Sequence, residues 1–394
     1  MAGGQPLNVL HIISDTNIGG AGSYLLNFLE FFDRSLLNVR VVCPAGSLLA
    51  ARCAAKGVEV IETARMPGDE SFQLQGLSRQ IRELVYIIRK HRIQAVHTHA
   101  SFAGRLAAKI AGVKCIIYTK HRLDEIKKPL KNSWKDKLRQ LVNDRTCSRV
   151  IAVSEAVREN LIRQGVNPGK IVVIHNGIDI EGLRKRAQQT GIQKNGRNRE
   201  EKGGFPAGWP LPGTASSVVG MVARLEPEKG HRYFLEAARD ILTIKKNVKF
   251  VIVGTGSLET ELKERARALG IQEAVIFTGF QENVAGLLAA MDVVVLPSLT
   301  ESFGLSLVEG MCLGKPCVAS RVGGIKEIIT DWENGLLVEP GNARGLAEKV
   351  FFLLQNPTFA QELGRRAART VEEKFDARIM AGKITELYYH HYYK

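Results

Sequence analysis

The sequence of 394 residues lacks several features that would place it in a specialised class of protein. It has no run of 18 or more apolar residues, which is the length typical of a membrane-spanning helix. Its six cysteines form no Cys-x-x-Cys pair, and several lie in apolar stretches, which indicates small buried side chains rather than a metal or disulfide framework. Its first residues show no charged leader followed by an apolar core, so we expect no secretion signal.

The composition excludes disordered and fibrous proteins. Hydrophobic residues make up 45% of the chain and charged residues 24%, and the mean hydropathy is −0.07, which suits ordinary buried cores. Because domains commonly contain about 150 residues, this length predicts two domains.

The net charge of +15 is unevenly distributed. Residues 1–170 carry 26 Lys and Arg against 14 Asp and Glu, whereas residues 205–394 carry 22 against 22. The first half is therefore expected to attract anionic partners, such as phosphorylated ligands, nucleic acid or an anionic membrane surface.

Short β-branched runs alternate with segments of helical length, which predicts parallel sheets wrapped by helices in two β/α domains. The runs lie at residues 9–13, 39–43, 58–61, 95–97, 115–118, 150–153 and 171–174 in the first half, and at 218–222, 250–253, 274–277, 293–296 and 317–319 in the second. We predict a first domain over 1–183, a Gly- and Pro-rich linker or insertion over 184–214, a second domain over 215–375, and a last helix over 376–394 that can reach back to the first domain.

A glycine-rich turn, residues 14–23, follows the first predicted strand and precedes a predicted helix over 24–32. Such a turn lets the backbone approach phosphate oxygens at the start of a helix. It lacks the third glycine of the dinucleotide fingerprint, and no Walker loop occurs in the chain. A tight turn without a ligand is the alternative.

Charged residues follow two strands of the second half. Arg224 and Lys229 come after the strand at 218–222, where two cations can meet an anion. The alternative is a solvated turn in which both pair with Glu226 and Glu228.

Two glutamates, Glu301 and Glu309, flank a predicted helix start near residues 303–305. Carboxylates suit sugar hydroxyls, and helix-start amides suit phosphate. Taken alone, this stretch favours a structural interpretation, with Glu301 as a helix cap and Glu309 as a buried ion-pair member.

Taken together, these segments resemble the family 4 retaining glycosyltransferases, also called glycosyltransferase group 1, over about residues 9–350. The resemblance implies an α/β chain of the GT-B fold, with two Rossmann-like β/α/β domains facing across a cleft that holds the donor. The segments are Gly-Gly-Ala-Gly at 19–22, Val153-Ser154-Glu155, Ile174-His175-Asn176-Gly177-Ile178-Asp179, Arg224 with Lys229, Gly279-Phe280, the Glu-x7-Glu stretch at 301–309, and Gly323-Gly324.

The resemblance implies transfer of a sugar, with retention, from a nucleotide-diphospho-sugar, which we expect to be a UDP-sugar. The leaving phosphate itself would take the acceptor's proton, so no protein nucleophile is required. The acceptor would be an envelope polysaccharide, lipopolysaccharide or glycolipid precursor. By resemblance, Arg224 and Lys229 would bind the diphosphate, and Glu301 would bind the sugar hydroxyls. The backbone amides of Phe303, Gly304 and Leu305 would contact the sugar and phosphates, and Glu309 would bind the ribose. Gly279 and Phe280 would contact the base, and Gly19 and Gly20 would approach the phosphates from the other domain.

Three histidines of the first half, His97, His99 and His121, lie at or just after the ends of predicted strands. His121 matches the family's histidine near the reacting sugar, where an imidazole can orient a hydroxyl or share developing charge. His97 and His99 share one face of a strand, but no carboxylate or cysteine partners stand at ligand spacing, and the chain has no Asp-x-Asp. We therefore expect no metal and no cofactor.

A basic segment runs from Lys120 to Arg149 and includes Trp134. It could lie on an anionic membrane surface or form a solvated helix face. We therefore expect a cytoplasmic protein, either in solution or peripheral on the inner face of the membrane. The aromatic end, residues 388–393, reads as a packing face rather than a ligand cluster.

Two other functions stay open at this point. One is a nucleotide-sugar epimerase or hydrolase on the same fold. The other is a basic nucleic-acid-binding protein, although no aromatic-interleaved basic motif or helix-turn-helix spacing is present, so we expect no nucleic acid as partner.

Overall fold

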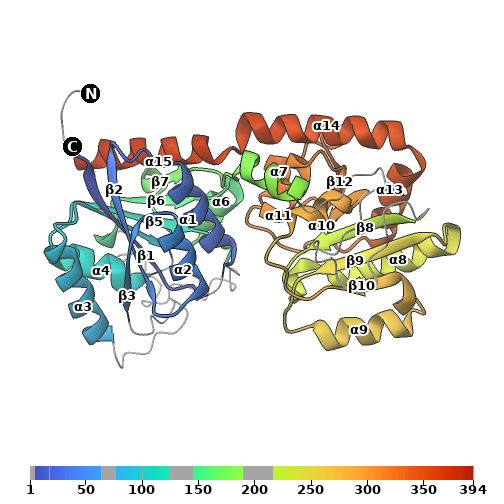
Figure 1. Cartoon of the computed structure of the whole chain (residues 1–394), viewed down its shortest axis with the longest axis horizontal. Coiled ribbons are helices and arrows are strands. Elements are labelled where there is room, and N and C mark those ends of the chain that lie inside the picture. Colours follow the sequence, from blue (N-terminus) through green and yellow to red (C-terminus); the bar gives the residue numbers. More distant parts are fainter. Residues whose placement is uncertain are drawn as a thin grey trace. The chain divides into compact units, whose positions relative to one another are not determined.

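A computed structural model describes residues 5–16, 18–63, 77–99, 101–124, 145–189 and 216–393. The chain divides into two compact units (Figure 1). Unit 1 comprises Met1–Gly177 together with Ala377–Lys394, and unit 2 comprises Ile178–Asp376. The chain thus leaves unit 1 once and returns to it at the end.

Unit 1 is built on a seven-stranded parallel sheet in the order β3-β2-β1-β4-β5-β6-β7. The buried strands are rich in β-branched residues, as expected of a sheet covered on both faces. The strands are β1 (Leu7–Ile13), β2 (Leu37–Pro44), β3 (Glu59–Thr63), β4 (Ala95–His99), β5 (Cys115–Lys120), β6 (Arg149–Ala152) and β7 (Ile171–Val173).

The helices of unit 1 begin at recognisable caps. Ser47, Ser101 and Ser154 each accept a hydrogen bond from a backbone amide three residues later, at the start of α2, α4 and α6. The helices are α1 (Gly20–Phe31), α2 (Leu48–Ala55), α3 (Leu77–Lys90), α4 (Phe102–Ile110), α6 (Glu155–Arg163) and α15 (Ala377–Tyr392).

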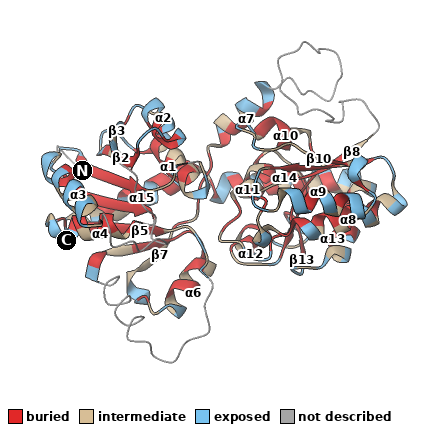
Figure 2. Ribbon diagram, turned by 90° about the horizontal axis from the view of Figure 1, so that it is seen from below, coloured by how far each residue is buried: buried red, intermediate tan, exposed pale blue. Residues whose placement is uncertain are grey.

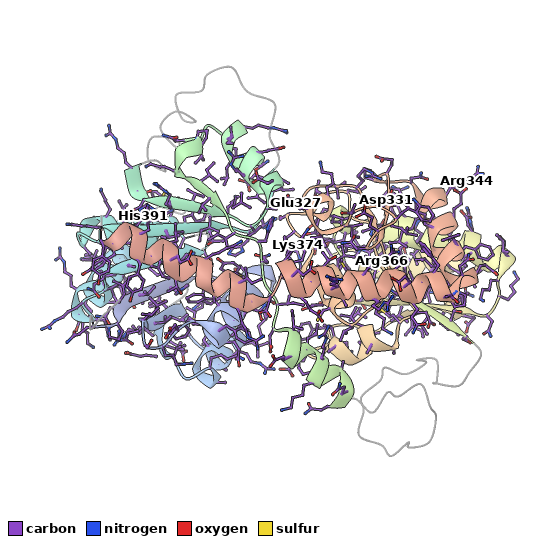
Figure 3. The ribbon with its side chains drawn as sticks, turned by 90° about the horizontal axis from the view of Figure 1, so that it is seen from above. Glu327, Asp331, Arg344, Arg366, Lys374 and His391 are labelled. Carbon is purple, nitrogen blue, oxygen red and sulfur yellow. The ribbon has the colours of Figure 1, made fainter. Side chains whose placement is uncertain are left out.

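Helix α15 is part of the core of unit 1, although it is the last element of the chain. Met380, Ile384 and Tyr388 are buried among the side chains of α1 and the first strands. Tyr389 donates a hydrogen bond to the carbonyl of Leu36, at 2.8 Å. Figure 3 shows this helix in side view, with His391 labelled near its end.

Unit 2 is built on a six-stranded parallel sheet in the order β10-β9-β8-β11-β12-β13. Its strands are β8 (Ser217–Val222), β9 (Val248–Val253), β10 (Val275–Phe277), β11 (Val293–Leu296), β12 (Cys317–Ser320) and β13 (Leu336–Val338). Its helices are α7 (Ile180–Gln189), α8 (His231–Ile244), α9 (Glu259–Ala268), α10 (Ala285–Ala290), α11 (Leu305–Cys312), α12 (Ile325–Ile328), α13 (Ala343–Gln355) and α14 (Pro357–Lys374).

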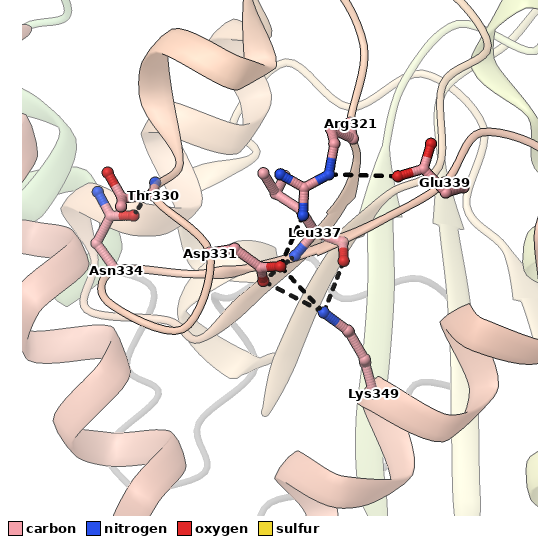
Figure 4. Close-up of polar contacts among 7 residues, drawn as sticks. All are labelled: Arg321, Thr330, Asp331, Asn334, Leu337, Glu339 and Lys349. Atoms are coloured by element: carbon pink, nitrogen blue, oxygen red, sulfur yellow. Dashed lines mark hydrogen bonds and ion pairs between the residues drawn. The ribbon is translucent and has the colours of Figure 1, made fainter.

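In both units the central strands are buried and most exposed residues lie on the outer helices and turns (Figure 2), whereas the edge strands β3 and β7 of unit 1 are only partly buried. A polar cluster supports the edge of the second sheet (Figure 4). The carboxylate of Asp331 forms ion pairs with Arg321 at 2.8 Å and with Lys349 at 3.2 Å, and it accepts a hydrogen bond from the backbone amide of Leu337 at 2.8 Å. This carboxylate therefore ties β13 to the loop after β12 and to helix α13.

The structure confirms two β/α domains and contains every predicted strand, but it corrects three details. Helix α1 begins at Gly20 rather than at residue 24, so the second and third glycines of the turn lie in its first turn. The predicted linker over 184–214 begins inside helix α7, while residues 190–214 lie outside the described residues. Strand β13, residues 336–338, is not among the predicted strands.

Within the described residues, none of the helices has the length and apolarity needed to cross a membrane. Of the basic segment from Lys120 to Arg149, residues 125–144 lie outside the described part of the chain, including Trp134.

Candidate active site

Both sheets have a point at which strand order reverses, and several of the predicted site residues follow the strands there. In unit 1 this point lies between β1 and β4, and in unit 2 between β8 and β11. Ligands of open parallel sheets bind at the carboxyl ends of the strands at such points, because the connecting helices diverge to opposite faces.

In unit 2 the loops after β8 and β11 are joined by an ion pair. The Nζ of Lys229 donates to the Oε2 of Glu301 at 2.7 Å, and the two side chains are only 17% and 10% exposed. Lys229 thus pairs with Glu301 rather than with a neighbour in its own turn. Arg224 does pair within the turn, with Glu228 at 3.0 Å, and its side chain is 61% exposed and accessible to an anion.

The ion pair depends on close approach of these loops. Gly230 has a positive φ of 72°, and a Cβ there would lie 2.0 Å from the carbonyl oxygen of Pro297. A Cβ on Gly324 would lie 2.4 Å from the carbonyl oxygen of Ser302. Only glycine fits both positions, so the backbone itself fixes the distance between Lys229 and Glu301.

Helix α11 begins at this site. Gly304, with φ at 108°, precedes its first residue, Leu305. The first amides of a helix have no partner within the helix, and they carry its positive dipole end. The side chain of Phe303 is buried and packs against Phe375 with ring centroids 5.5 Å apart. At 303 only the backbone could therefore meet a ligand.

Glu309 lies one turn into α11 and is partly buried. Burial raises its pKa from 4.5 to about 7, although the charge of Arg186 opposes the rise. Among the described residues no hydrogen bond or ion pair of the Glu309 carboxyl group is found, so its oxygens are free to accept hydrogen bonds from a ligand.

The loop after β10 presents Gly279 and Phe280. Gly279 has a φ of 69°, and its carbonyl accepts a hydrogen bond from Gly254 at 2.9 Å, which fixes the loop beside β9. The ring of Phe280 is 61% exposed, so it offers a free face on which a planar ring could stack.

In unit 1, Gly19 and Gly20 stand at the start of α1. Their conformations do not require glycine, since Gly19 is extended and Gly20 is helical. A Cβ at either position would meet no atom within 4 Å. The missing side chains therefore leave open space at the amino end of a twelve-residue helix.

His121 follows β5 and belongs to a buried network. Its Nε2 lies 3.0 Å from the Nδ1 of His99, whose Nε2 lies 3.1 Å from the Nδ1 of His11. The Nε2 of His11 lies 3.1 Å from the hydroxyl of Tyr388, which is 2.5 Å from the Nδ1 of His97. The chain of contacts ends at Thr119, 2.6 Å from the Nε2 of His97.

The network is electrically neutral. Burial lowers the pKa of His11 and of His121 from 6.5 to about 3. Burial and the neighbouring imidazoles hold the pKa of His97 and His99 well below the ordinary value. At neutral pH each ring therefore has one N–H donor and one lone pair.

A metal ion fits this network poorly. Nitrogens of His11, His97 and His99 do lie within 4.8 Å of one another. However, His97 and His99 stack with their planes 19° apart, and His11 and His99 with theirs 16° apart. Ring lone pairs lie in the ring plane, so those of stacked rings lie in separate, nearly parallel planes and do not converge on one point, and hydrogen bonds already engage these nitrogens.

Sequence reasoning missed three of these residues. His11 stands opposite His97 because β1 pairs with β4, a pairing between strands far apart in the chain. Tyr388 reaches the network from the last helix, whose aromatic end the sequence predicts only as a packing face. His231, beside Lys229, is buried, and burial with the nearby lysine lowers its pKa to about 4. The adjacency to Lys229 was the one available signal.

The chain matches two family models. Residues 18–181 match Glycosyltransferase Family 4, and residues 212–370 match Glycosyl transferases group 1.

The chain is also similar to individual glycosyltransferases. The chain is 30% identical over 273 residues to the UDP-Gal:alpha-D-GlcNAc-diphosphoundecaprenol alpha-1,3-galactosyltransferase of Escherichia coli, covering 66% of each protein. It is 30% identical over 317 residues to EpsD of Bacillus subtilis (strain 168), described as a glycosyltransferase, covering 75% of this chain and 78% of that protein. The crystal structure of Anabaena HepE in complex with UDP and glucose superposes with a TM-score of 0.76 at 23% identity, covering 96% of this chain and 98% of HepE.

Proposed function

Because this chain belongs to the family 4 glycosyltransferases, whose solved neighbours share its two Rossmann-like domains, we propose that it transfers a sugar from a UDP-sugar to a lipid-linked or polysaccharide precursor of the cell envelope. The name of the Escherichia coli relative, with its UDP-Gal donor and diphosphoundecaprenol acceptor, supports both halves of this proposal. The bound UDP of HepE supports the donor.

The observation that carries the proposal is the Lys229–Glu301 pair at the point where the second sheet reverses strand order. In it a cation and a carboxylate are held together beside the start of α11. The cation would neutralise the charge that builds on the diphosphate as the glycosidic bond breaks, and the carboxylate would hold sugar hydroxyls. Arg224, which is exposed, would add a second cation for the diphosphate.

The remaining contacts are proposed from the same geometry. Glu309 would accept hydrogen bonds from the ribose, and the base would lie at Gly279 and Phe280. The amides of residues 303–305 would meet the sugar and phosphates, and Gly19 with Gly20 would leave room for the phosphates in unit 1. His121 would contact a hydroxyl of the donor sugar through its ring.

We propose that turnover retains the anomeric configuration and needs no metal. The cations Arg224 and Lys229 supply the charge that a metal would otherwise bring to the diphosphate. The leaving phosphate would accept the acceptor's proton. The basic first domain, including the segment from Lys120 to Arg149, would favour an anionic or membrane-borne acceptor. Liposome sedimentation with and without anionic lipid tests that contact, and equal binding to both would contradict it.

The first experiment is thermal stabilisation by UDP, GDP, ADP, CMP and their sugars. A ligand at a hundred times its dissociation constant adds about 2.7 kcal/mol. We expect UDP and UDP-sugars alone to stabilise the protein, and Lys229→Ala and Glu309→Ala to lose the shift. Lys263→Ala is the matched control, because Lys263 pairs with Glu259 on the outer helix α9, and it should keep the shift.

Other results would favour other functions. Release of free sugar or an epimer from the donor without any acceptor would favour a hydrolase or epimerase. Indifference to all nucleotides, together with DNA or RNA affinity that falls steeply with salt, would favour nucleic-acid binding.

A further inference from the structure

One ring nitrogen of the buried network in unit 1 makes no hydrogen bond within the network. The Nδ1 of His121 is buried and has no hydrogen-bond partner among the described residues, whereas its Nε2 is engaged by His99. The ring of Tyr24 packs edge-on against His121, with centroids 5.0 Å apart, so the imidazole is held in place. What this free nitrogen can do depends on whether it carries a proton.

The linked hydrogen bonds require every imidazole in the row to donate its N–H in the same direction along the row. A neutral imidazole has one N–H and one lone pair, so a ring that accepts at one nitrogen must donate from the other. His121, His99 and His11 are linked nitrogen to nitrogen, and therefore all three donate in the same direction. The direction is set where the chain meets a group of different chemistry, which is Tyr388.

The distances around the Tyr388 hydroxyl indicate that direction. Hydroxyl donors make shorter hydrogen bonds than ring N–H donors. The contact of Tyr388 with His97 Nδ1 is 2.5 Å, and that with His11 Nε2 is 3.1 Å. The hydroxyl therefore donates to His97 and accepts from the Nε2–H of His11. Because a neutral His97 that accepts at Nδ1 must donate from Nε2, its 2.6 Å contact with Thr119 is a hydrogen bond from the ring N–H to the hydroxyl oxygen.

We propose that Tyr388, through His11 and His99, holds His121 as the Nε2–H tautomer and so keeps its Nδ1 as a hydrogen-bond acceptor for a hydroxyl of the donor sugar. His11 accepts from the Nε2–H of His99, and His99 accepts from the Nε2–H of His121. Tyr388 is thus a positioning residue that acts from the last helix of the chain. The sugar contact rests on the proposed function, whereas the tautomer does not.

Nitrogen-15 NMR of histidine-labelled full-length protein tests the tautomer directly, since a protonated and an unprotonated ring nitrogen differ strongly in shift. The nine histidines give a simple spectrum, and His121 is assigned with His121→Asn. We expect a single Nε2–H tautomer in the wild type. Tyr388→Phe removes the acceptor of the His11 N–H, so His121 should become mixed or shift to Nδ1–H. A wild-type Nδ1–H tautomer, or an unchanged tautomer in folded Tyr388→Phe, overturns the proposal.

Two further variants make the test sharper. Tyr389→Phe removes a hydroxyl from the same helix that bonds only to a backbone carbonyl, and it should leave the His121 tautomer unchanged. Thr119→Val removes the acceptor at the far end of the network and should disturb His121 as Tyr388→Phe does. It also provides a second test if Tyr388→Phe does not fold.

The sugar contact is tested by adding ligands to the wild type. UDP-galactose or UDP-glucose should shift the His121 Nδ1 signal, and UDP alone should not. With the sugar used by the enzyme, Tyr388→Phe should lower kcat about tenfold or more with little change in KM, because wrong tautomers of working histidines are costly. The expected tautomer with no response to either sugar would overturn the positioning role and the proposed sugar contact, while leaving UDP binding in unit 2 standing.

Discussion

The two units share one architecture, but the side chains where strand order reverses are neutral in unit 1 and ionic in unit 2. Each has a parallel sheet whose strand order reverses once, and each places polar side chains at that point. Unit 1 buries neutral imidazoles linked by hydrogen bonds, with no ion pair among His11, His97, His99 and His121. Unit 2 instead holds the Lys229–Glu301 ion pair between its loops. The topology thus provides the location, and the side chains decide between tautomeric and ionic chemistry.

The largest expected effect of this difference is a loss of stability of unit 1 on acidification. The folded pKa of His11, about 3, lies below its unfolded value of 6.5. The neutral form therefore contributes stability that is complete above pH 6.5 and is lost as the pH falls toward 3. The loss reaches about 5 kcal/mol for His11 alone.

Hydrogen exchange measured by mass spectrometry at several pH values checks this expectation by comparison with unit 2, where burial lowers the pKa of His231 less far, to about 4. Amides of β1 and β4 should lose protection at a higher pH than those of β8 and β11. Loss of protection in β8 and β11 first would contradict the electrostatic contrast between the units.

The second prediction concerns the ion pair of unit 2. Lys229→Met leaves the nearly buried Glu301 without its cation and should cost about 3 kcal/mol of stability. Lys229→Met with Glu301→Gln should recover most of that loss, because no unpaired charge remains. Both variants lack the cation, so we expect the rate of sugar transfer to fall a hundredfold or more in each of them. Thermal melts and rates of UDP release measure both effects, and an active double variant would refute the role of the charge.

The third prediction concerns Glu309, whose folded pKa of about 7 is raised above the unfolded 4.5. A raised pKa gives stability that is complete below pH 4.5 and is lost as the pH rises through 7. Glu309→Gln does not titrate, so it should gain stability relative to the wild type by at most about 3 kcal/mol between pH 4.5 and 8.

Urea titrations at the two pH values measure this gain. Glu264→Gln, on the exposed face of α9, is the control and should show no such gain. A wild type and a Glu309→Gln variant that respond equally to pH would rule out burial of an uncompensated carboxyl at 309.

The smallest effect is expected at the Asp331 cluster, which is ionic but structural. Asp331→Asn keeps the size of the side chain but weakens its contacts with Arg321 and Lys349. Because these side chains are partly exposed, we expect a loss of about 1 kcal/mol and unchanged UDP binding. A thermal melt with and without UDP measures both, and a lost UDP shift would place this cluster in the binding machinery.

The sequence predicts the strands well because buried parallel strands are continuous β-branched runs. It also predicts the loops that carry Lys229 and Glu301, since each directly follows such a run. It does not predict that His11 lies opposite His97, because the order of strands in a sheet depends on packing between distant segments. For the same reason the part played by Tyr388 is visible only once α15 has been placed on unit 1.

The return of the chain to unit 1 has a consequence for biosynthesis. A ribosome completes all seven strands of the first sheet long before it reaches residue 377, yet the core around them still lacks Met380, Ile384 and Tyr388. Unit 2, whose residues are contiguous, can fold while unit 1 waits with an apolar surface uncovered. A premature stop just before residue 377 would therefore damage the earliest-made unit and spare the later one.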